Sequence, residues 1–154
     1  MKRAIDLAKR ANGEIPVGAI IVKDGEILAE TFNQKEVLND VTAHAEILAI
    51  REAEQKLGSW RLDNCEMYVT LEPCPMCAGA IVMSRVERVV YGSTDARAGA
   101  CESVFNIPGN ETLNHRPEMT AGVLQAECAD IMKRFFKMRR GQRRQEKDKQ
   151  GTPV

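Results

Sequence analysis

The sequence predicts an α/β layered domain, in which helices pack on a β-sheet. Segments with helical periodicity alternate with short segments rich in β-branched residues along most of the 154-residue chain. The composition is that of an ordinary globular domain, with 44% hydrophobic and 29% charged residues, which excludes collagen-like and strongly disordered classes. Because this length suits one full hydrophobic core and no linker interrupts it, we expect a single domain over residues 1–144.

Eight elements are expected along the chain. They are, in order, a helix over residues 2–11, strands over 17–23 and 26–31, a helix over 42–57, a strand over 66–71, a helix over 75–84, a strand over 86–91 and a helix over 122–141. We expect residues 92–114 to be mostly loop, with one helical turn around 98–104. Residues 145–154 are polar, and we expect this tail to fray.

Turn and capping residues give the boundaries of these elements. The Asp-Gly pair at 24–25 is a strong hairpin signal between the first two strands. Thr42 can cap the second helix, and Gly58 can end it. Pro75 suits the first position of the third helix, which makes Cys74 the N-cap of that helix.

The residues that can carry chemistry fall into two groups far apart in the sequence. His44, Ala45 and Glu46 form the first group, and Cys74 and Cys77 form a C-x-x-C pair. One imidazole and two thiolates are three good zinc ligands, and a catalytic zinc site keeps its fourth position open for water. On a helix, the side chain of Glu46 points away from that of His44, so Glu46 is available as a proton carrier. The cluster therefore predicts a hydrolytic zinc enzyme.

Both groups lie at predicted helix N-termini, where the partial positive charge lowers the pKa of thiols and disfavours protonation of histidine. The main alternative is a closed structural zinc site, with Cys65 or Cys101 as the fourth ligand and Glu46 as a surface residue. A redox C-x-x-C pair is a weaker alternative, because it leaves His44 and Glu46 unexplained. Five cysteines without disulfide-type spacing favour metal binding and a reducing, cytoplasmic compartment.

A formal net charge of zero hides a strong asymmetry. Residues 133–149 contain nine Lys and Arg residues and two acidic residues, so this segment carries +7 and the remainder carries −7. Such a segment predicts an anionic partner, RNA or DNA, whose phosphates it contacts. The alternative is a solvated basic helix face with a buried aromatic edge at Phe135 and Phe136. No apolar run approaches membrane-spanning length, so we expect no membrane partner.

These motifs resemble those of a known family. H-A-E at 44–46 followed by P-C-x-x-C at 73–77 is the signature of the zinc-dependent cytidine and deoxycytidylate deaminases. Over nearly all of residues 4–140 the chain is similar to bacterial tRNA-specific adenosine deaminases, in segments 15–19, 42–46, 71–80, 90–92, 99–100, 114–116 and 135–140 and at Asn33 and Asp95. The resemblance implies a three-layer α/β/α cytidine deaminase-like fold with a central mixed five-stranded sheet.

The resemblance also implies a reaction. The substrate would be the adenosine at wobble position 34 of a tRNA anticodon, that of tRNA-Arg, and the product would be inosine. His44, Cys74 and Cys77 would bind one Zn²⁺ per subunit. Zinc-bound hydroxide would attack adenine C6, Glu46 would shuttle protons, and ammonia would leave. The rival hypotheses are a deaminase of free bases or nucleosides, and a non-catalytic zinc module that binds nucleic acid.

Further residues receive binding roles from the same resemblance. The Asn33 side chain would hold the purine edge, and backbone amides near Ala45 would orient the base. Loops often carry binding residues, so the loop position of Asp95 and Asn114 predicts that they bind substrate, and that of Arg97 predicts a contact with the RNA backbone. The basic charge pattern predicts further backbone contacts by Lys137, Arg139 and Arg140. The family works as a homodimer with the anticodon arm bound near the dimer interface. From the residues alone, a turn former is the favoured interpretation of Asn33, and a cap or solvated residue that of Asp95. His115 could be a fourth metal ligand or contact the RNA backbone, but a packed or solvated loop residue is the favoured interpretation.

Overall fold

The computed structural model describes residues 1–150 as a central sheet of five strands with four helices. The elements are α1 (Lys2–Ala8), β1 (Gly18–Lys23), β2 (Glu26–Phe32), α2 (Ala45–Leu57), β3 (Cys65–Leu71), α3 (Pro75–Ser84), β4 (Arg88–Ser93), β5 (Glu118–Thr120) and α4 (Gln125–Gln150). The strand order is β2-β1-β3-β4-β5. Because β1 is antiparallel to β2 and β3, whereas β3, β4 and β5 are parallel, the sheet is mixed as predicted.

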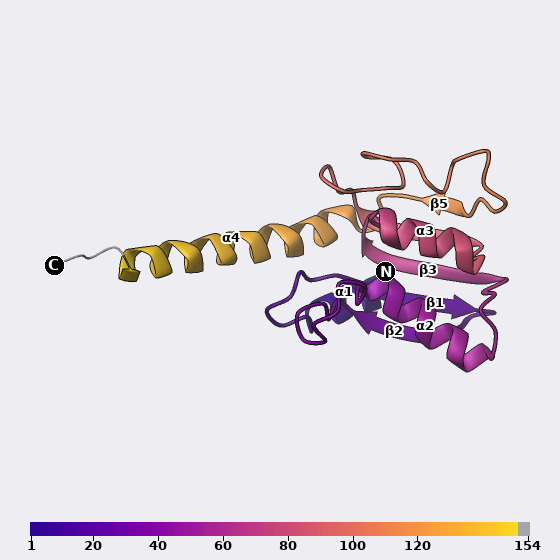
Figure 1. Ribbon diagram of the computed structural model, residues 1–154, viewed down its shortest axis with the longest axis horizontal. Helices are drawn as coiled ribbons and strands as arrows, with labels where there is room; N and C mark the ends of the chain where they lie inside the picture. Colours follow the sequence, from indigo (N-terminus) through magenta and orange to yellow (C-terminus); the bar gives the residue numbers. More distant parts are fainter. Residues whose placement is uncertain (151–154) are drawn as a thin grey trace.

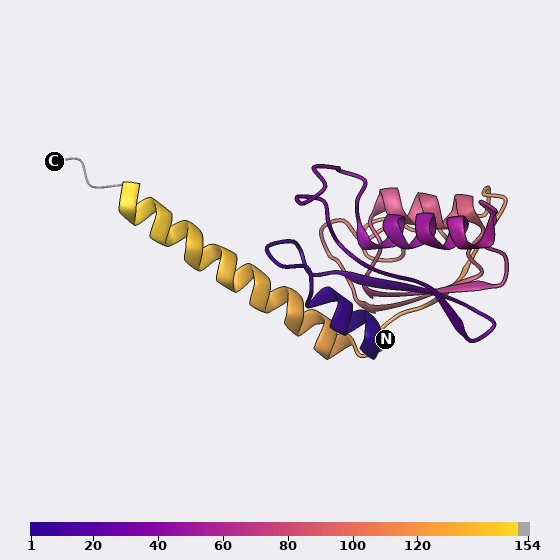
Figure 2. The same ribbon diagram turned by 90° about the horizontal axis from the view of Figure 1, so that it is seen from below.

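Helices cover both faces of the sheet, which confirms the three-layer architecture. Figure 2 shows α2 and α3 on one face and α1 with the first turns of α4 on the other. Alternation along β1 sends successive side chains to opposite layers. Ile21 packs with Met67 in the large core beneath α2 and α3. Its neighbour Ile20 packs with Leu7 and Tyr68 beneath α1.

Only the beginning of α4 lies on the sheet. Cys128, buried at 1% exposure, packs against β4 where Gly92 leaves room for it, since a Cβ at Gly92 would lie 2.3 Å from the Cys128 Sγ. The rest of α4 projects beyond the body of the molecule in both ribbon views (Figures 1 and 2). Within residues 1–150, no helix combines the length and hydropathy that crossing a bilayer requires.

Several predicted boundaries are wrong by a few residues. The first helix ends at Ala8 rather than residue 11, because the amides of Arg10 and Ala11 turn to i−3 carbonyl oxygens at 2.9 and 3.2 Å. The N-cap of α2 is His44 and not Thr42, whose hydroxyl instead donates to Asp40 at 2.7 Å. Gly58, Pro75 and Cys74 have the predicted end and start positions.

The C-terminal part differs more from the prediction. The short strand β5 was not expected where it lies, and no helix forms over 98–104, which is a series of turns. The last helix is α4 (Gln125–Gln150), so residues 145–150 of the expected frayed tail are helical. Residues 151–154 of that tail lie outside the described residues. The strand expected over 86–91 begins at Arg88 and extends to Ser93.

Candidate metal and catalytic site

Two helix starts present the predicted metal ligands. His44 and Cys74 occupy the N-cap positions of α2 and α3, both with extended backbone (φ −71°, ψ 152° and φ −73°, ψ 173°). Neither side chain makes a capping hydrogen bond, so both are free to face another partner. Cys77 lies one turn into α3 and is buried. The carbonyl of Ala45 accepts a hydrogen bond from the Thr31 hydroxyl at 2.6 Å, which fixes the start of α2 on β2.

The distances between these three side chains fit a metal ion. The ligand atoms of His44, Cys74 and Cys77 all lie within 4.8 Å of one another. The Nδ1 atom of His44 lies 3.6 Å from the Cys74 Sγ and 3.5 Å from the Cys77 Sγ. Usual zinc bond lengths at the tetrahedral angle place a nitrogen and a sulfur ligand about 3.6 Å apart. The donor set and its spacing therefore match a zinc site with three protein ligands.

Glu46 lies beside this cluster without belonging to it. Its side chain is 4% exposed in the first turn of α2, and its carboxylate is not one of the converging ligand atoms. Burial raises the pKa of Glu46 to about 7. A dication bound by the neighbouring ligands would lower this pKa and favour the ionised carboxylate. A buried carboxylate beside the ligands but outside their set has the position that a general acid and base requires.

The pKa of only one of the two thiols shifts in the direction expected for a metal ligand. A hydrogen bond with Cys77 and another with His44 lower the pKa of Cys74 to about 4. The same bond, together with burial, raises the pKa of Cys77, and the bond to Cys74 raises that of His44. The helix N-termini were expected to lower the pKa values of Cys77 and His44, so both shifts are opposite to the expectation. The Cys74 thiolate lies closer to these two groups than the helix charge does. Binding of a cation would displace the protons that the thiolate helps to hold on them.

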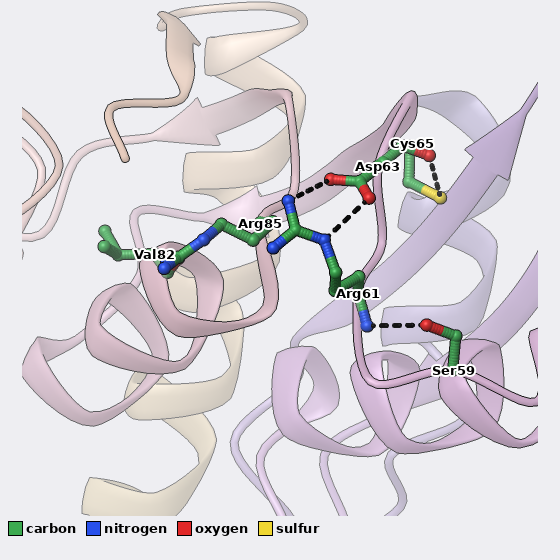
Figure 3. A network of polar contacts seen from close by, with 6 residues as sticks. All are labelled: Ser59, Arg61, Asp63, Cys65, Val82 and Arg85. Carbon is green, nitrogen blue, oxygen red and sulfur yellow. Dashed lines mark hydrogen bonds and ion pairs between the residues drawn. The ribbon is translucent and has the colours of Figure 1, made fainter. Parts of the chain in front are cut away.

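The two cysteines considered as a fourth ligand lie elsewhere. Cys65 is the first residue of β3, and Cys74 follows the other end of that strand. At the usual rise per residue, the strand separates the two ends by roughly 20 Å. Its thiol contacts the Asp63 carbonyl at 3.7 Å, within the network that Figure 3 shows between α2 and β3. Cys101 is buried in the large core, and its thiol is not among the converging ligand atoms. In the described part of the chain, the converging group has three members, as a catalytic site requires.

Asn33 has the turn role considered for it. The residue follows β2 and is buried at 6% exposure. Its Nδ2 donates to the Ile15 carbonyl at 3.1 Å, and its Oδ1 accepts from the Lys35 amide at 3.4 Å. These contacts fix the side chain between the 15–17 segment and the loop that leads to His44. The turn interpretation is thus satisfied, and contact with a base stays a prediction.

Glu72 is a structural residue that the sequence analysis missed. Its carboxylate is 1% exposed and accepts five hydrogen bonds. The donors are the amides of Asp95 (2.9 Å), Cys101 (3.1 Å), Glu102 (2.8 Å) and Ser103 (2.9 Å) and the Ser103 hydroxyl (2.5 Å). Two residues before Cys74, it ties the loop over 94–105 to the start of α3. A buried acid within the L-E-P-C segment was the available signal, since such a carboxylate needs partners.

The loop residues expected to contact RNA lie at the surface. The Asp95 carboxylate accepts from the amides of Arg97 and Ala98 at 2.9 and 3.4 Å, which is the cap role considered for it. Arg97 and Asn114 are exposed. His115 does not join the metal cluster, because its Nε2 lies 2.6 Å from the Val86 carbonyl. Their RNA contacts stay predictions.

The basic residues named for RNA contact lie on α4. Lys137, Arg139 and Arg140 are all exposed on the part of the helix that projects from the body. The Arg139 guanidinium lies 6.0 Å from the centre of the Phe135 ring. The chain thus separates a partly buried metal cluster from an exposed cationic helix.

Comparison with known sequences identifies relatives of the chain. The family described as the cytidine and deoxycytidylate deaminase zinc-binding region matches residues 1–93. The chain is 48% identical over 139 residues to the tRNA-specific adenosine deaminase of Bacillus subtilis (strain 168), a match that covers 89% of this chain and 86% of that one. It is 50% identical over 139 residues to the tRNA-specific adenosine deaminase of Aquifex aeolicus (strain VF5), covering 89% and 91%.

Solved structures show the same fold. A structure from a study of A-to-I editing by tRNA:A34 deaminases at the wobble position of transfer RNA superposes with a TM-score of 0.83 at 44% identity, covering 85% of this chain and 96% of that chain. A guanine deaminase from Bacillus subtilis superposes with a TM-score of 0.59 at 36% identity, covering 91% and 90%. Both likenesses extend over most of the sheet and its helices.

Proposed function

The chain belongs to the cytidine and deoxycytidylate deaminase zinc-binding family, and on that premise we propose that it converts the wobble adenosine 34 of a tRNA, that of tRNA-Arg, to inosine. The observation that carries this proposal is the separation of three converging metal ligands from one buried carboxylate. Relatives named tRNA-specific adenosine deaminase, at 48% and 50% identity, support the choice of substrate.

Each residue of the cluster has a defined part in this reaction. His44, Cys74 and Cys77 would hold one Zn²⁺ per subunit, and the N–S spacing of 3.5–3.6 Å supports this assignment. When bound, the ion supplies the nucleophile by lowering the pKa of a water molecule. Glu46 would take one proton from the water and deliver it to the purine ring nitrogen, and would then carry the second proton of that water to the departing amine. A C–O bond to adenine C6 replaces the C–N bond, and ammonia leaves.

Positioning of the base is assigned to residues around the cluster. The Asn33 amide would hold the purine edge, and backbone amides near Ala45 would orient the ring. Asn33 is already fixed by Ile15 and Lys35, which supports a preorganised role. Asp95 and Asn114 would contact the neighbouring nucleotides. An anticodon loop suits such a site, because extruding an unpaired base costs less than opening a duplex.

Assembly and location complete the proposal. We expect a homodimer with the anticodon arm near its interface. The outer face of α3 supports a partner, because α3 contains no charged residue and its Met83 is 70% exposed. All five cysteines are free thiols, which suits the reducing cytoplasm. The cationic surface for the RNA backbone would include Arg97, Lys137, Arg139 and Arg140.

A second candidate is deamination of a free base, which the likeness to a guanine deaminase favours. Such an enzyme shares the metal cluster but has no use for a helix that carries nine Lys and Arg residues between 133 and 149. Salt separates the two functions. Deamination of RNA should weaken steeply as salt rises, whereas turnover of a free base should not.

One experiment tests the proposal directly. The purified zinc-loaded protein is incubated with a tRNA carrying adenosine at the wobble position and with the same tRNA carrying guanosine there, and inosine is read by sequencing. We expect inosine only in the first tRNA. Absence of inosine from the first tRNA would show the proposed function to be wrong, and deamination of free guanine would support the second candidate.

A further inference from the structure

Five basic side chains form a line along one face of α4. We name this line the α4 basic stripe, and its members are Lys133, Lys137, Arg140, Arg144 and Lys147. They are spaced by four, three, four and three residues, and each residue turns a helix by about 100°, so all five fall within a sector of roughly 80°. The stripe extends over about 21 Å at the usual helical rise. All five side chains are exposed.

The stripe faces away from the body and is free of local partners. Cys128, Ile131 and Phe135 lie on the opposite side of the helix, and the other half-buried residues of α4, Ala129 and Met132, both precede the stripe. Within residues 1–150, the one ion pair of α4 joins Arg134 to Asp130 at 2.7 Å, and Arg134 lies outside the stripe. The stripe is therefore a continuous cationic surface whose five side chains make no ion pair within residues 1–150, with Asp148 about 20° beyond its edge.

The direction of α4 relates the stripe to the metal cluster. In both ribbon views, α4 projects from the end of the body at which α2 and α3 begin, which is where His44 and Cys74 lie (Figures 1 and 2). An RNA loop whose base enters the cluster has its stem outside the body on this same side. Resting on the proposed function, we propose that the α4 basic stripe binds the phosphates of the base-paired stem that adjoins the substrate loop.

The chemistry of the helix favours a nucleic-acid backbone over a lipid surface. A helix that lies in a membrane interface needs an apolar face opposite its charges. From Arg139 to Gln150 the helix contains no apolar side chain larger than glycine. Lysine and arginine contacts to phosphates release counterions without any apolar burial, so the stripe has what backbone binding requires and lacks what insertion requires.

A pair of matched variants tests the stripe. The stripe variant combines Lys137→Gln, Arg140→Gln and Arg144→Gln, and the control variant combines Arg134→Gln, Arg143→Gln and Lys149→Gln, which removes the same charge from other faces of the same helix. Glutamine keeps helix propensity, and circular dichroism checks that α4 remains helical. Dissociation constants are measured against salt for a stem-loop RNA and for a single-stranded RNA of the loop alone.

We expect the stripe variant to reduce the salt slope for the stem-loop RNA by about two, because each lost phosphate contact removes about 0.7–0.9. The control variant should change the slope by less than about one, and neither variant should change the slope for the loop RNA. Equal losses in the two variants, or a loss on the loop RNA equal to that on the stem-loop, would overturn the proposal. Failure of the proposed function is seen separately, as absence of inosine in the wild-type reaction.

Discussion

The metal cluster and the projecting part of α4 are opposites in the same chain. The cluster is built from side chains that helix starts and hydrogen bonds fix in place, with Glu46 and Cys77 buried. Every residue from 136 to 150 is exposed, and the projecting helix packs against nothing in the body. The difference teaches that the chemistry depends on fixed geometry at low solvent exposure, whereas polymer binding depends on charge that salt can screen. Changes in the two regions should therefore alter different measurable quantities.

The largest effect is expected at Glu46. Glu46→Gln removes the proposed proton carrier but keeps the volume of the side chain, so the single-turnover rate of deamination should fall by about 10²–10⁴-fold. Zinc content and RNA affinity should remain, because the carboxylate is not among the converging ligands. Glu54→Gln on the same helix serves as the control and should keep its activity. Survival of activity in Glu46→Gln would remove Glu46 from the mechanism.

Metal removal should abolish activity and also weaken the fold. Without the ion, the partly buried ligands of α2 and α3 lose the bonds that hold the two helix starts together, and ligand binding to the native state is a stability term. A chelator should therefore stop deamination and lower Tm, and added Zn²⁺ should restore both. RNA binding through α4 should persist in the metal-free protein. Tm unchanged by complete metal removal would contradict the assigned ligands.

Glu72 should affect stability more than chemistry. Glu72→Gln replaces a carboxylate that accepts five hydrogen bonds with an amide that must direct N–H groups at some of the same donors, so the free energy of unfolding should fall by about 2–3 kcal/mol. Denaturant unfolding measures the change, with the exposed Glu111→Gln as control. A loss within error of the control would show that the loop over 94–105 is held by other contacts.

The same substitution has a predictable dependence on pH. Burial alone would raise the pKa of Glu72, but the hydrogen bonds from Ser103 and the loop amides outweigh it and lower the pKa. A carboxylate with a lowered pKa contributes stability at neutral pH and loses it as pH falls through the folded-state pKa. The stability difference between wild type and Glu72→Gln should therefore shrink on acidification. A difference that grows toward acid pH would contradict this assignment.

The smallest effects are expected when alanine replaces two glycines, one in the body of the molecule and one in the projecting part of α4. A Cβ at Gly92 would lie 2.3 Å from the Cys128 Sγ, so Gly92→Ala should destabilise the docked start of α4 by about 1–3 kcal/mol. A Cβ at Gly141 would meet nothing within 4 Å. Gly141→Ala should increase helicity but leave Tm of the body unchanged, because the projecting helix is not packed on it. A clear rise in Tm would show that α4 is coupled to the body.

Local sequence signals predicted most of the fold. The Asp-Gly turn, the glycine stop at Gly58 and the proline at Pro75 act through backbone conformation, and each has its predicted position. The strand β5 escaped prediction because its three residues gain their pairing from β4 rather than from their own pattern. The N-cap propensity of threonine predicts that Thr42 caps α2, but its hydroxyl donates a hydrogen bond to Asp40 instead.

The metal cluster was predictable, and its surroundings were less so. The residue types and spacing of His44, Cys74 and Cys77 indicate the ligand set without knowledge of how their helices pack. The directions of the pKa shifts of the Cys77 thiol and the His44 imidazole were not predictable from helix charge. They depend on contacts of 3.5–3.6 Å between residues far apart in the sequence. The role of Glu72 was not predictable for the same reason, since all five of its hydrogen-bond donors lie 23–31 residues away in the sequence.

The separation of chemistry from polymer binding is tested most directly by one paired measurement. The single-turnover rate at saturating protein and the dissociation constant are measured on the same stem-loop RNA for wild type, for Glu46→Gln and for the stripe variant. We predict that Glu46→Gln lowers the rate without changing the dissociation constant, and that the stripe variant raises the dissociation constant without changing the rate. A change in both quantities for both variants would contradict the separation.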